Sequence, residues 1–274
     1  MDITTTPIAD LSATISYSTM ESFIYVMFAL VIVMTLVDVW HKKSMRWFNE
    51  NVAKGKLNAT KDLSAGDKVG IAVSTIVVDV LSAGEFCNFN RKLAHLLTMY
   101  GFILFNAMTA IIIFSGAAEA ANTLYATLWH VGAIMLAVGG WWFWLFIRVD
   151  VAAEGNKWYN ISAMDMFSIS LIATSTFALI WSYVGGGTGV TFGLFILSAV
   201  SLFGGVLWSK FAHMFFKPFA AYEKRTTKAN GSAMNLPTIT RDDPEQQKRH
   251  SMELLVDAPM NMGLGIKREA PKHY

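Results

Sequence analysis

The stretch SFIYVMFALVIVMTLVDVW, from Ser22 to Trp40, is apolar over almost its whole length. A helix that crosses the roughly 30 Å of hydrocarbon in a bilayer needs about 20 mostly apolar residues, and this stretch supplies them. Four further runs meet the same test: Leu93 to Phe114, Leu124 to Ile147, Met164 to Tyr183 and Val190 to Phe211. The sequence therefore predicts an all-α integral membrane protein built as a five-helix transmembrane bundle.

The composition agrees with a bilayer as the solvent. Of the 274 residues, 54% are hydrophobic and 15% are charged, and the mean hydropathy is positive, at +0.41. Soluble domains of this length carry more charge and less apolar surface. A single cysteine, Cys87, excludes a disulfide framework and an iron–sulfur cluster held by this chain alone, because such clusters need about four cysteines. We find no nucleotide-binding loop, zinc box or nucleophile elbow.

The distribution of Lys and Arg predicts the orientation. All 22 of them fall in segments that a five-span topology with the N-terminus outside places in the cytoplasm or at its boundary, as the positive-inside rule requires. The outer segments carry no Lys or Arg; they are Met1 to Glu21, Ser115 to Thr123 and the Gly185-Gly186-Gly187 turn. We expect a multi-pass protein of a prokaryotic cytoplasmic membrane, with the C-terminus in the cytoplasm.

A further apolar segment, Val69 to Ala83, is too short to span the membrane and carries Asp79. A span here would also place Arg91 and Lys92 outside. We therefore expect an interfacial helix on the cytoplasmic face; a loop helix packed on the bundle is the alternative. The predicted division is an outer segment at 1–21, the bundle with this helix at 22–216, and a cytoplasmic tail at 217–274.

Three histidines in or next to the spans are candidate functional residues, because polar groups are costly inside a bilayer. His95 lies about one turn inside the cytoplasmic end of the second span, and His213 lies at the cytoplasmic end of the fifth. His130 lies nearer the outer end of the third span. His95 and His213 thus stand at similar depths on two antiparallel spans.

The local sequences around the first two histidines match, as Lys92-Leu93-Ala94-His95 and Lys210-Phe211-Ala212-His213. A bis-histidine haem needs two imidazoles at one depth on facing helices, small neighbours beside them, and cations for its propionates. Ala94 and Ala212 are the small neighbours. The candidate propionate partners are Arg91, Lys92, Lys210 and Lys217. The pattern predicts one haem b with His95 and His213 as axial ligands of the iron.

Two other interpretations of these histidines stay open. Both could be residues of the headgroup region in basic boundaries, or they could bind another metal. A closed zinc site is disfavoured, because two ligands are too few for it.

These features resemble a family, the five-helix cytochrome b membrane subunits of respiratory nitrate reductase, of heterodisulfide reductase and of sulfur-metabolism complexes. The membrane anchors of adenylylsulfate reductase are the most similar group. The resemblance covers about residues 22 to 225. It rests on three segments: Val77-Val78-Asp79-Val80-Leu81, Arg91-Lys92-Leu93-Ala94-His95 with Tyr100-Gly101-Phe102, and the closing run from Ser209 to Pro218.

The resemblance implies four haem-ligating histidines, two each on the second and fifth helices, and this chain departs from that pattern. Phe105 and Phe195 stand where the outer pair is expected, so the outer haem should be absent or differently ligated. His130 could ligate a replacement haem, bind a quinone headgroup or be a core histidine with satisfied hydrogen bonds. Gly139 and Gly140, and Gly204 and Gly205, should permit close helix packing.

The tail from Lys217 to Tyr274 carries 10 basic and seven acidic residues and cannot form a large core. A short helix is expected near Pro244, followed by the apolar patch Leu254-Leu255-Val256. The tail is either a solvated, disordered segment or a docking arm for a soluble subunit.

The resemblance implies a function in electron transfer. The chain would carry a b-type haem and link the quinone pool to a cytoplasmic oxidoreductase with flavin or iron–sulfur centres, with adenylylsulfate reductase as the partner suggested by the family. It would be a non-catalytic or quinone-reacting subunit, and no nucleic acid partner is expected. A haem-free anchor that recruits a soluble redox enzyme is the alternative. A transporter is disfavoured by the lack of acidic residues in mid-span.

Overall fold

The computed structural model describes residues 2–84, 86, 88–149, 157–207 and 213–234. Within these ranges every regular element is a helix. The chain forms two compact units, of which the first comprises Met1–Trp47 and Phe86–Lys217 and the second Phe48–Glu85 and Pro218–Tyr274.

Among its described residues, the first unit contains four helices that are long and apolar enough to cross a membrane. They are α2 (Tyr17–Lys42), α5 (Phe89–Ser115), α7 (Thr123–Trp142) with the π-helical turn η2 (Phe143–Ile147), and η3 (Ala163–Asp165) with α8 (Met166–Tyr183). Four of the five predicted spans are therefore confirmed as helices of sufficient length. The fifth, α9 (Val190–Gly204), is apolar but has only 15 residues before the short 3-10 turn η4 (Gly205–Leu207). Its predicted end at Phe211 lies outside the described residues.

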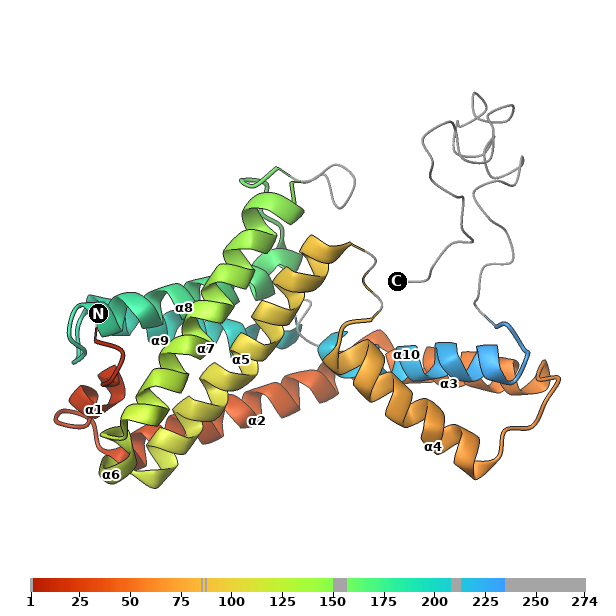
Figure 1. Ribbon diagram of the computed structural model, residues 1–274, viewed down its shortest axis with the longest axis horizontal. Helices are drawn as coiled ribbons and strands as arrows, with labels where there is room; N and C mark the ends of the chain where they lie inside the picture. Colours follow the sequence, from red (N-terminus) through yellow and green to blue (C-terminus); the bar gives the residue numbers. More distant parts are fainter. Residues whose placement is uncertain (1, 85, 87, 150–156, 208–212, 235–274) are drawn as a thin grey trace. The chain divides into compact units, whose positions relative to one another are not determined.

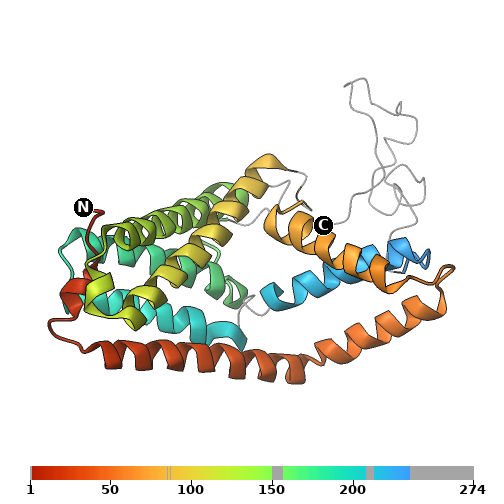
Figure 2. The same cartoon turned by 60° about the horizontal axis from the view of Figure 1, so that its bottom comes forward.

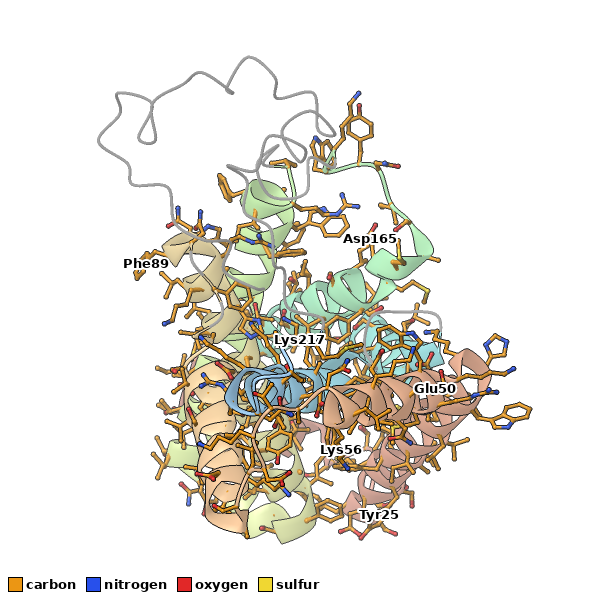
Figure 3. All side chains as sticks on the ribbon, turned by 90° about the vertical axis from the view of Figure 1, so that its right-hand side faces the viewer. Tyr25, Glu50, Lys56, Phe89, Asp165 and Lys217 are labelled. Carbon is orange, nitrogen blue, oxygen red and sulfur yellow. The ribbon has the colours of Figure 1, made fainter. Side chains whose placement is uncertain are left out.

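The surface of these helices is apolar, as expected of a membrane protein. Eight large apolar side chains of α2 are exposed: Tyr25, Val26, Phe28, Ile32, Val33, Leu36, Val37 and Trp40. Tyr25 and Phe89, at the start of α5, point away from the ribbon in Figure 3. A patch of this extent would be unusual on a soluble monomer.

Side-chain caps fix where the helices begin. Asn88 Oδ1 accepts hydrogen bonds from the backbone N–H groups of Asn90 and Arg91, and Asn122 Oδ1 accepts one from Leu124 N–H. Each cap satisfies donors that a helix start leaves without intrahelical partners. The beginning of α5, which carries His95, is thereby set by its sequence. The short helices α1 (Pro7–Leu11) and α6 (Ala117–Ala120) complete this unit.

Helices α5 and α7 pack closely, and they lie side by side in Figures 1 and 2. Three glycines make this contact possible. A Cβ at Gly132 would lie 2.6 Å from Phe105 N, one at Gly101 would lie 2.5 Å from Leu136 N, and one at Gly139 would lie 2.7 Å from Thr98 N. The packing role predicted for Gly139 is confirmed, and Gly140 packs on Ile172 of α8. A Cβ at Gly204 would meet nothing within 4 Å, so no such contact is seen there.

The core of the first unit is aromatic. Trp129 of α7 and Trp181 of α8 are almost fully buried. Trp129 Nε1 donates to Thr109 Oγ1 over 3.0 Å, and Trp181 Nε1 donates to the Gly187 carbonyl over 2.9 Å. Helix α8 packs mainly on α9 and α7, and α2 contacts α9 and α5.

The second unit holds α4 (Ala65–Ser74), the π-helical η1 (Thr75–Leu81), and most of both α3 (Ser44–Leu57) and α10 (His213–Ala229). The loop after α3 is tied to the end of α10, because the Asn230 carbonyl accepts hydrogen bonds from the Thr60 and Lys61 N–H groups. The helix predicted at 69–83 is present as α4 and η1 together. Its place at the membrane surface stays a prediction.

Candidate functional site

His95 lies in the second turn of α5 and is exposed. Its imidazole packs on the ring of Phe86, with centroids 4.8 Å apart and an interplanar angle of 34°. The Lys217 ammonium lies 5.9 Å from the centroid of that same ring. Two residues that the sequence places 122 positions apart, His95 and Lys217, thus share one aromatic neighbour.

The other predicted residues of this site lie close to these two in sequence. Arg91 and Lys92 stand in the first turn of α5, and both are partly buried. His213 is the first residue of α10, one helical turn before Lys217, and its side chain lies outside the described part of the chain. Lys210 also lies outside the described residues. Phe86 was not predicted as a site residue, because nothing in its sequence context marks it.

Ala94, expected to leave room for a macrocycle, is buried against α7. A Cβ at Gly139 would lie 2.9 Å from the Ala94 carbonyl oxygen, so the two backbones already touch. The small size of Ala94 therefore serves the contact between α5 and α7. His95 is the next residue, and its exposure shows that it lies on a different side of α5.

Aromatic contacts join α5 to α9. The ring centroids of Phe102 and Phe203 are 6.3 Å apart. Phe105 meets Phe195 edge-on, with 6.4 Å between their ring centroids. Trp129 packs on Phe105 at 5.0 Å, and Trp181 stacks on Phe195 at 5.5 Å. The two phenylalanines at the positions expected for outer ligands are therefore neighbours in the core. Four rings pack together at this level.

His130 is buried in α7, and both of its ring nitrogens have protein partners. Nδ1 lies 2.8 Å from the Ala126 carbonyl oxygen, and Nε2 lies 2.7 Å from Ser182 Oγ on α8. The Trp129 ring packs edge-on against the imidazole at 4.9 Å. Iron or a quinone could bind His130 only by displacing one of these hydrogen bonds. The geometry matches that of a core histidine with satisfied hydrogen bonds.

Two charged pairs at the helix ends were not predicted. Asp38 of α2 is buried and forms an ion pair with Lys42, one turn further along. The i,i+4 spacing of an acid and a base is a signal that could have indicated it. Asp38 lies four residues before the end of α2, so mid-span positions of that helix remain free of acids.

The second pair joins Arg148, just after η2, to residues 157–165. Arg148 is buried, with its guanidinium 4.3 Å from the Trp144 ring centroid. It donates hydrogen bonds to the carbonyls of Lys157 and Asn160 at 2.8 and 2.6 Å, and to Asp165 Oδ2 at 2.7 Å. A planar fork with several donors suits Arg to such a site. Protein groups thus bind both terminal nitrogens of Arg148, which gives the arrangement the form of a structural clamp.

Among the described residues, no group of three His, Cys, Asp or Glu side chains is placed to hold a metal ion. A haem with two axial histidines does not need such a group. The chain matches no protein-family model, no curated protein and no solved structure.

Proposed function

We propose that the chain is a membrane electron-transfer subunit that carries one b-type haem and links the quinone pool to a cytoplasmic oxidoreductase. The observation that carries the proposal is the meeting of His95 and Lys217 at the ring of Phe86. Because both residues lie against Phe86, the beginning of α5 and the beginning of α10 lie close together. A haem ligated by His95 and His213 needs that proximity.

The register of the helices supports the pairing. Phe102 and Phe203 are in contact; His95 precedes Phe102 by seven residues, and His213 follows Phe203 by ten. At about 1.5 Å per helical residue, His95 lies about 10 Å along α5 from Phe102. The residues between η4 and α10 lie outside the described part of the chain, so the depth of His213 belongs to the proposal.

The residues present fit a haem of this kind. His95 lies outside the packed core and beside the cations Arg91, Lys92 and Lys217. These three, with Lys210, would bind the propionates, while His95 and His213 would hold the iron and tune its potential. The haem would supply one-electron transfer, and the protein would fix the imidazoles and their distance from water.

One haem is proposed because Phe105 and Phe195 replace the outer ligands and fill their level with aromatic rings. The proposed topology is five spans, with the N-terminus outside and both the 69–83 helix and the tail in the cytoplasm of a prokaryote. The partner would carry flavin or iron–sulfur centres, and the family resemblance suggests adenylylsulfate reductase. Quinone would be the second redox partner, in the lipid phase.

The test is to measure haem in the purified full chain by the pyridine haemochrome method and by dithionite-reduced spectra. The proposal expects close to one haem b per chain, with a low-spin spectrum. A chain that folds, remains monodisperse in detergent and is colourless after expression with ample haem would overturn it.

A haem-free membrane anchor is the second candidate, and the contact between Phe105 and Phe195 favours it, because two aromatic rings meet where the resemblance implies an outer haem. An anchor needs only a docking arm. Removing residues 235–274 keeps α10 and the Asn230 contacts with Thr60 and Lys61. If the tail is the arm, this variant should insert normally and lose its soluble partner in co-purification. Retention of the partner would dismiss the docking role.

A further inference from the structure

In the helical segment formed by α4 and η1, polar side chains are buried and aliphatic side chains are exposed. Thr75 is buried, and Asp79 is almost so, while Ile71 one turn earlier is partly buried. These three residues recur every four positions and share one face. The opposite face is exposed and aliphatic, with Val69, Val73, Ile76 and Val77 exposed by 63, 55, 52 and 52%. A helix in water would place the polar residues outward.

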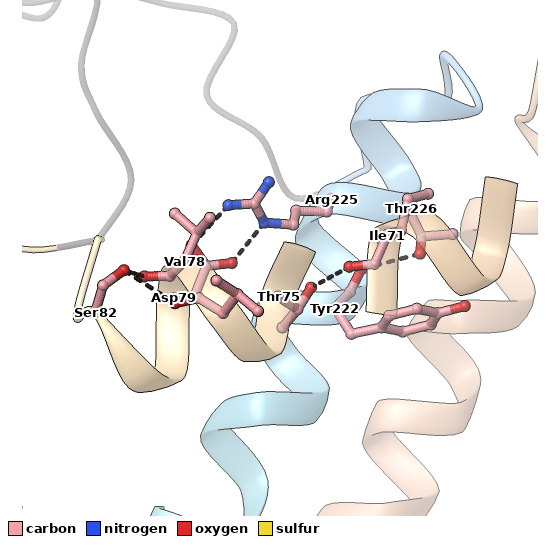
Figure 4. A network of polar contacts seen from close by, with 9 residues as sticks. Ile71, Thr75, Val78, Asp79, Ser82, Tyr222, Arg225 and Thr226 are labelled. Atoms are coloured by element: carbon pink, nitrogen blue, oxygen red, sulfur yellow. Dashed lines mark hydrogen bonds and ion pairs between the residues drawn. The ribbon is translucent and has the colours of Figure 1, made fainter. Parts of the chain in front are cut away.

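The polar groups of this segment are satisfied within the second unit (Figure 4). Arg225 of α10 binds Asp79 through two hydrogen bonds, Nε to Oδ2 at 2.5 Å and a terminal nitrogen to Oδ1 at 2.8 Å. Thr75 Oγ1 donates to the Ile71 carbonyl, and Ser82 Oγ lies within hydrogen-bond distance of the Val77 and Val78 carbonyls. Asp79 is the only charged residue from Val69 to Gly84. From Val69 onward the segment therefore carries no charge that lacks a partner.

The length of the chain limits where the aliphatic face can be. Seven residues lie between Leu81, the end of η1, and Phe89, the start of α5, so these two residues are no more than about 30 Å apart. Helix α5 is one of the four helices able to cross a membrane. The face is thus tethered to the end of a membrane-crossing helix. It carries none of the Trp, Tyr or Arg residues that dominate binding between proteins.

We propose that α4 and η1 bind the bilayer surface, with Val69, Val73, Ile76 and Val77 in the boundary between headgroups and acyl chains. The segment is too short to span, and its aliphatic face suits interfacial binding. The exposed Lys61 and Lys68 near its beginning would meet anionic headgroups. The ion pair between Asp79 and Arg225 makes this binding possible, because it neutralises the Asp79 carboxylate, whose charge would otherwise keep the segment in water.

The first experiment locates the face in the full chain, in nanodiscs that contain one copy each and anionic lipid. Val73→Cys and Ile76→Cys are made in a Cys87→Ser background and labelled with the fluorophore NBD. Asp62→Cys, on the exposed loop before α4, is the matched control. We expect lipid-borne doxyl quenchers to act several-fold more strongly at positions 73 and 76 than at 62, and aqueous iodide to act in the reverse order.

Strong iodide quenching at 73 and 76 would overturn the proposal, because the face would then lie in water or await a second copy. Protection from both quenchers would also overturn it, because the face would then be covered by protein.

The second experiment tests the ion pair, with NBD at position 73. Arg225→Ala leaves the Asp79 carboxylate without its guanidinium, so doxyl quenching should fall several-fold. Exchanging the two residues, as Asp79→Arg with Arg225→Asp, should restore it. Replacing both, as Asp79→Asn with Arg225→Gln, should keep it, because no charge remains. Unchanged quenching in Arg225→Ala would show that the pair is not needed.

Discussion

Three buried or nearly buried charged residues of the described part of the chain are each held by a nearby partner of opposite charge. Asp38 is paired with Lys42, Arg148 with Asp165, and Asp79 with Arg225. Removing one partner of a buried pair is more destabilising than removing both, because it leaves a charge without compensation. These pairs are accordingly better explained as structural than as parts of a proton or ion pathway.

The stability of the folded chain should depend on pH through Glu223 of α10. Partial burial raises the pKa of its carboxyl above the ordinary 4.5, and the nearby Lys56 opposes that rise. The folded state then holds the proton more tightly than the unfolded state. The stabilisation is complete below about pH 4.5 and is lost as the pH rises through the raised value.

Glu223→Gln keeps the shape and removes the titration. The difference in melting temperature between this variant and the unchanged chain should favour the variant increasingly as the pH rises above about 4.5. Thermal unfolding in detergent between pH 4 and 8 measures it. A difference that does not change with pH would contradict the assignment.

For single residues, the sequence could predict roles that depend on neighbours in the chain. Lys217 and His95 could be nominated from their neighbours in the chain; the i,i+4 spacing of Asp38 and Lys42 is equally local, although their pair was not predicted. Phe86, which joins His95 to Lys217, and Arg225, which lies 146 residues from Asp79, could not be found. Such contacts depend on how the helices return to one another, and no local pattern encodes that.

At the scale of helices, the contact between α5 and α7 depends on glycines, which have no side chain to keep the helices apart. A Cβ at Gly132 would lie 2.6 Å from Phe105 N and 2.9 Å from Phe105 Cα, both backbone atoms that cannot rotate away. Small residues at such contacts allow close packing in membranes. The helices must separate if Gly132 gains a methyl group.

Gly132→Ala should therefore destabilise the chain by about 1–3 kcal/mol, the usual cost of overpacking. Gly193→Ala in α9 is the matched control, because a Cβ there meets nothing within 4 Å; its stability should be unchanged or slightly higher, since Ala is the better helix former. Melting temperatures in one detergent compare the two. Equal stability of both variants would show that the α5–α7 contact is not tight at Gly132.

Four of the predicted spans correspond to helices of sufficient length among the described residues, because length and apolarity are properties of the chain itself. The shortness of α9 was not predicted, since the apolar run continues past Gly204 without a helix-breaking proline. The π-helical turns η1 and η2 were not predicted either, because the apolar pattern does not distinguish them from α-helix. His130 was open to three interpretations because its partner, Ser182, lies on another helix.

For the whole molecule, the topology is a direct prediction from the position of the charges. Membrane-impermeant labelling of single cysteines in intact cells should leave positions 54 and 158 unlabelled and should label positions 119 and 186. Lys54 and Trp158 lie among cytoplasmic cations in the proposed topology, whereas the outer segments contain none. Labelling of position 54 from outside would contradict the five-span arrangement.

The central claim is that His95 and His213 are the two axial ligands of one low-spin haem b. The most direct measurement is the low-temperature electron paramagnetic resonance spectrum of the purified chain and of three variants, His95→Ala, His213→Ala and His130→Ala. The account predicts that the low-spin signal disappears in the first two and persists in the third, because His130 is already bonded at both nitrogens. An unaltered low-spin signal in His95→Ala or in His213→Ala would contradict it.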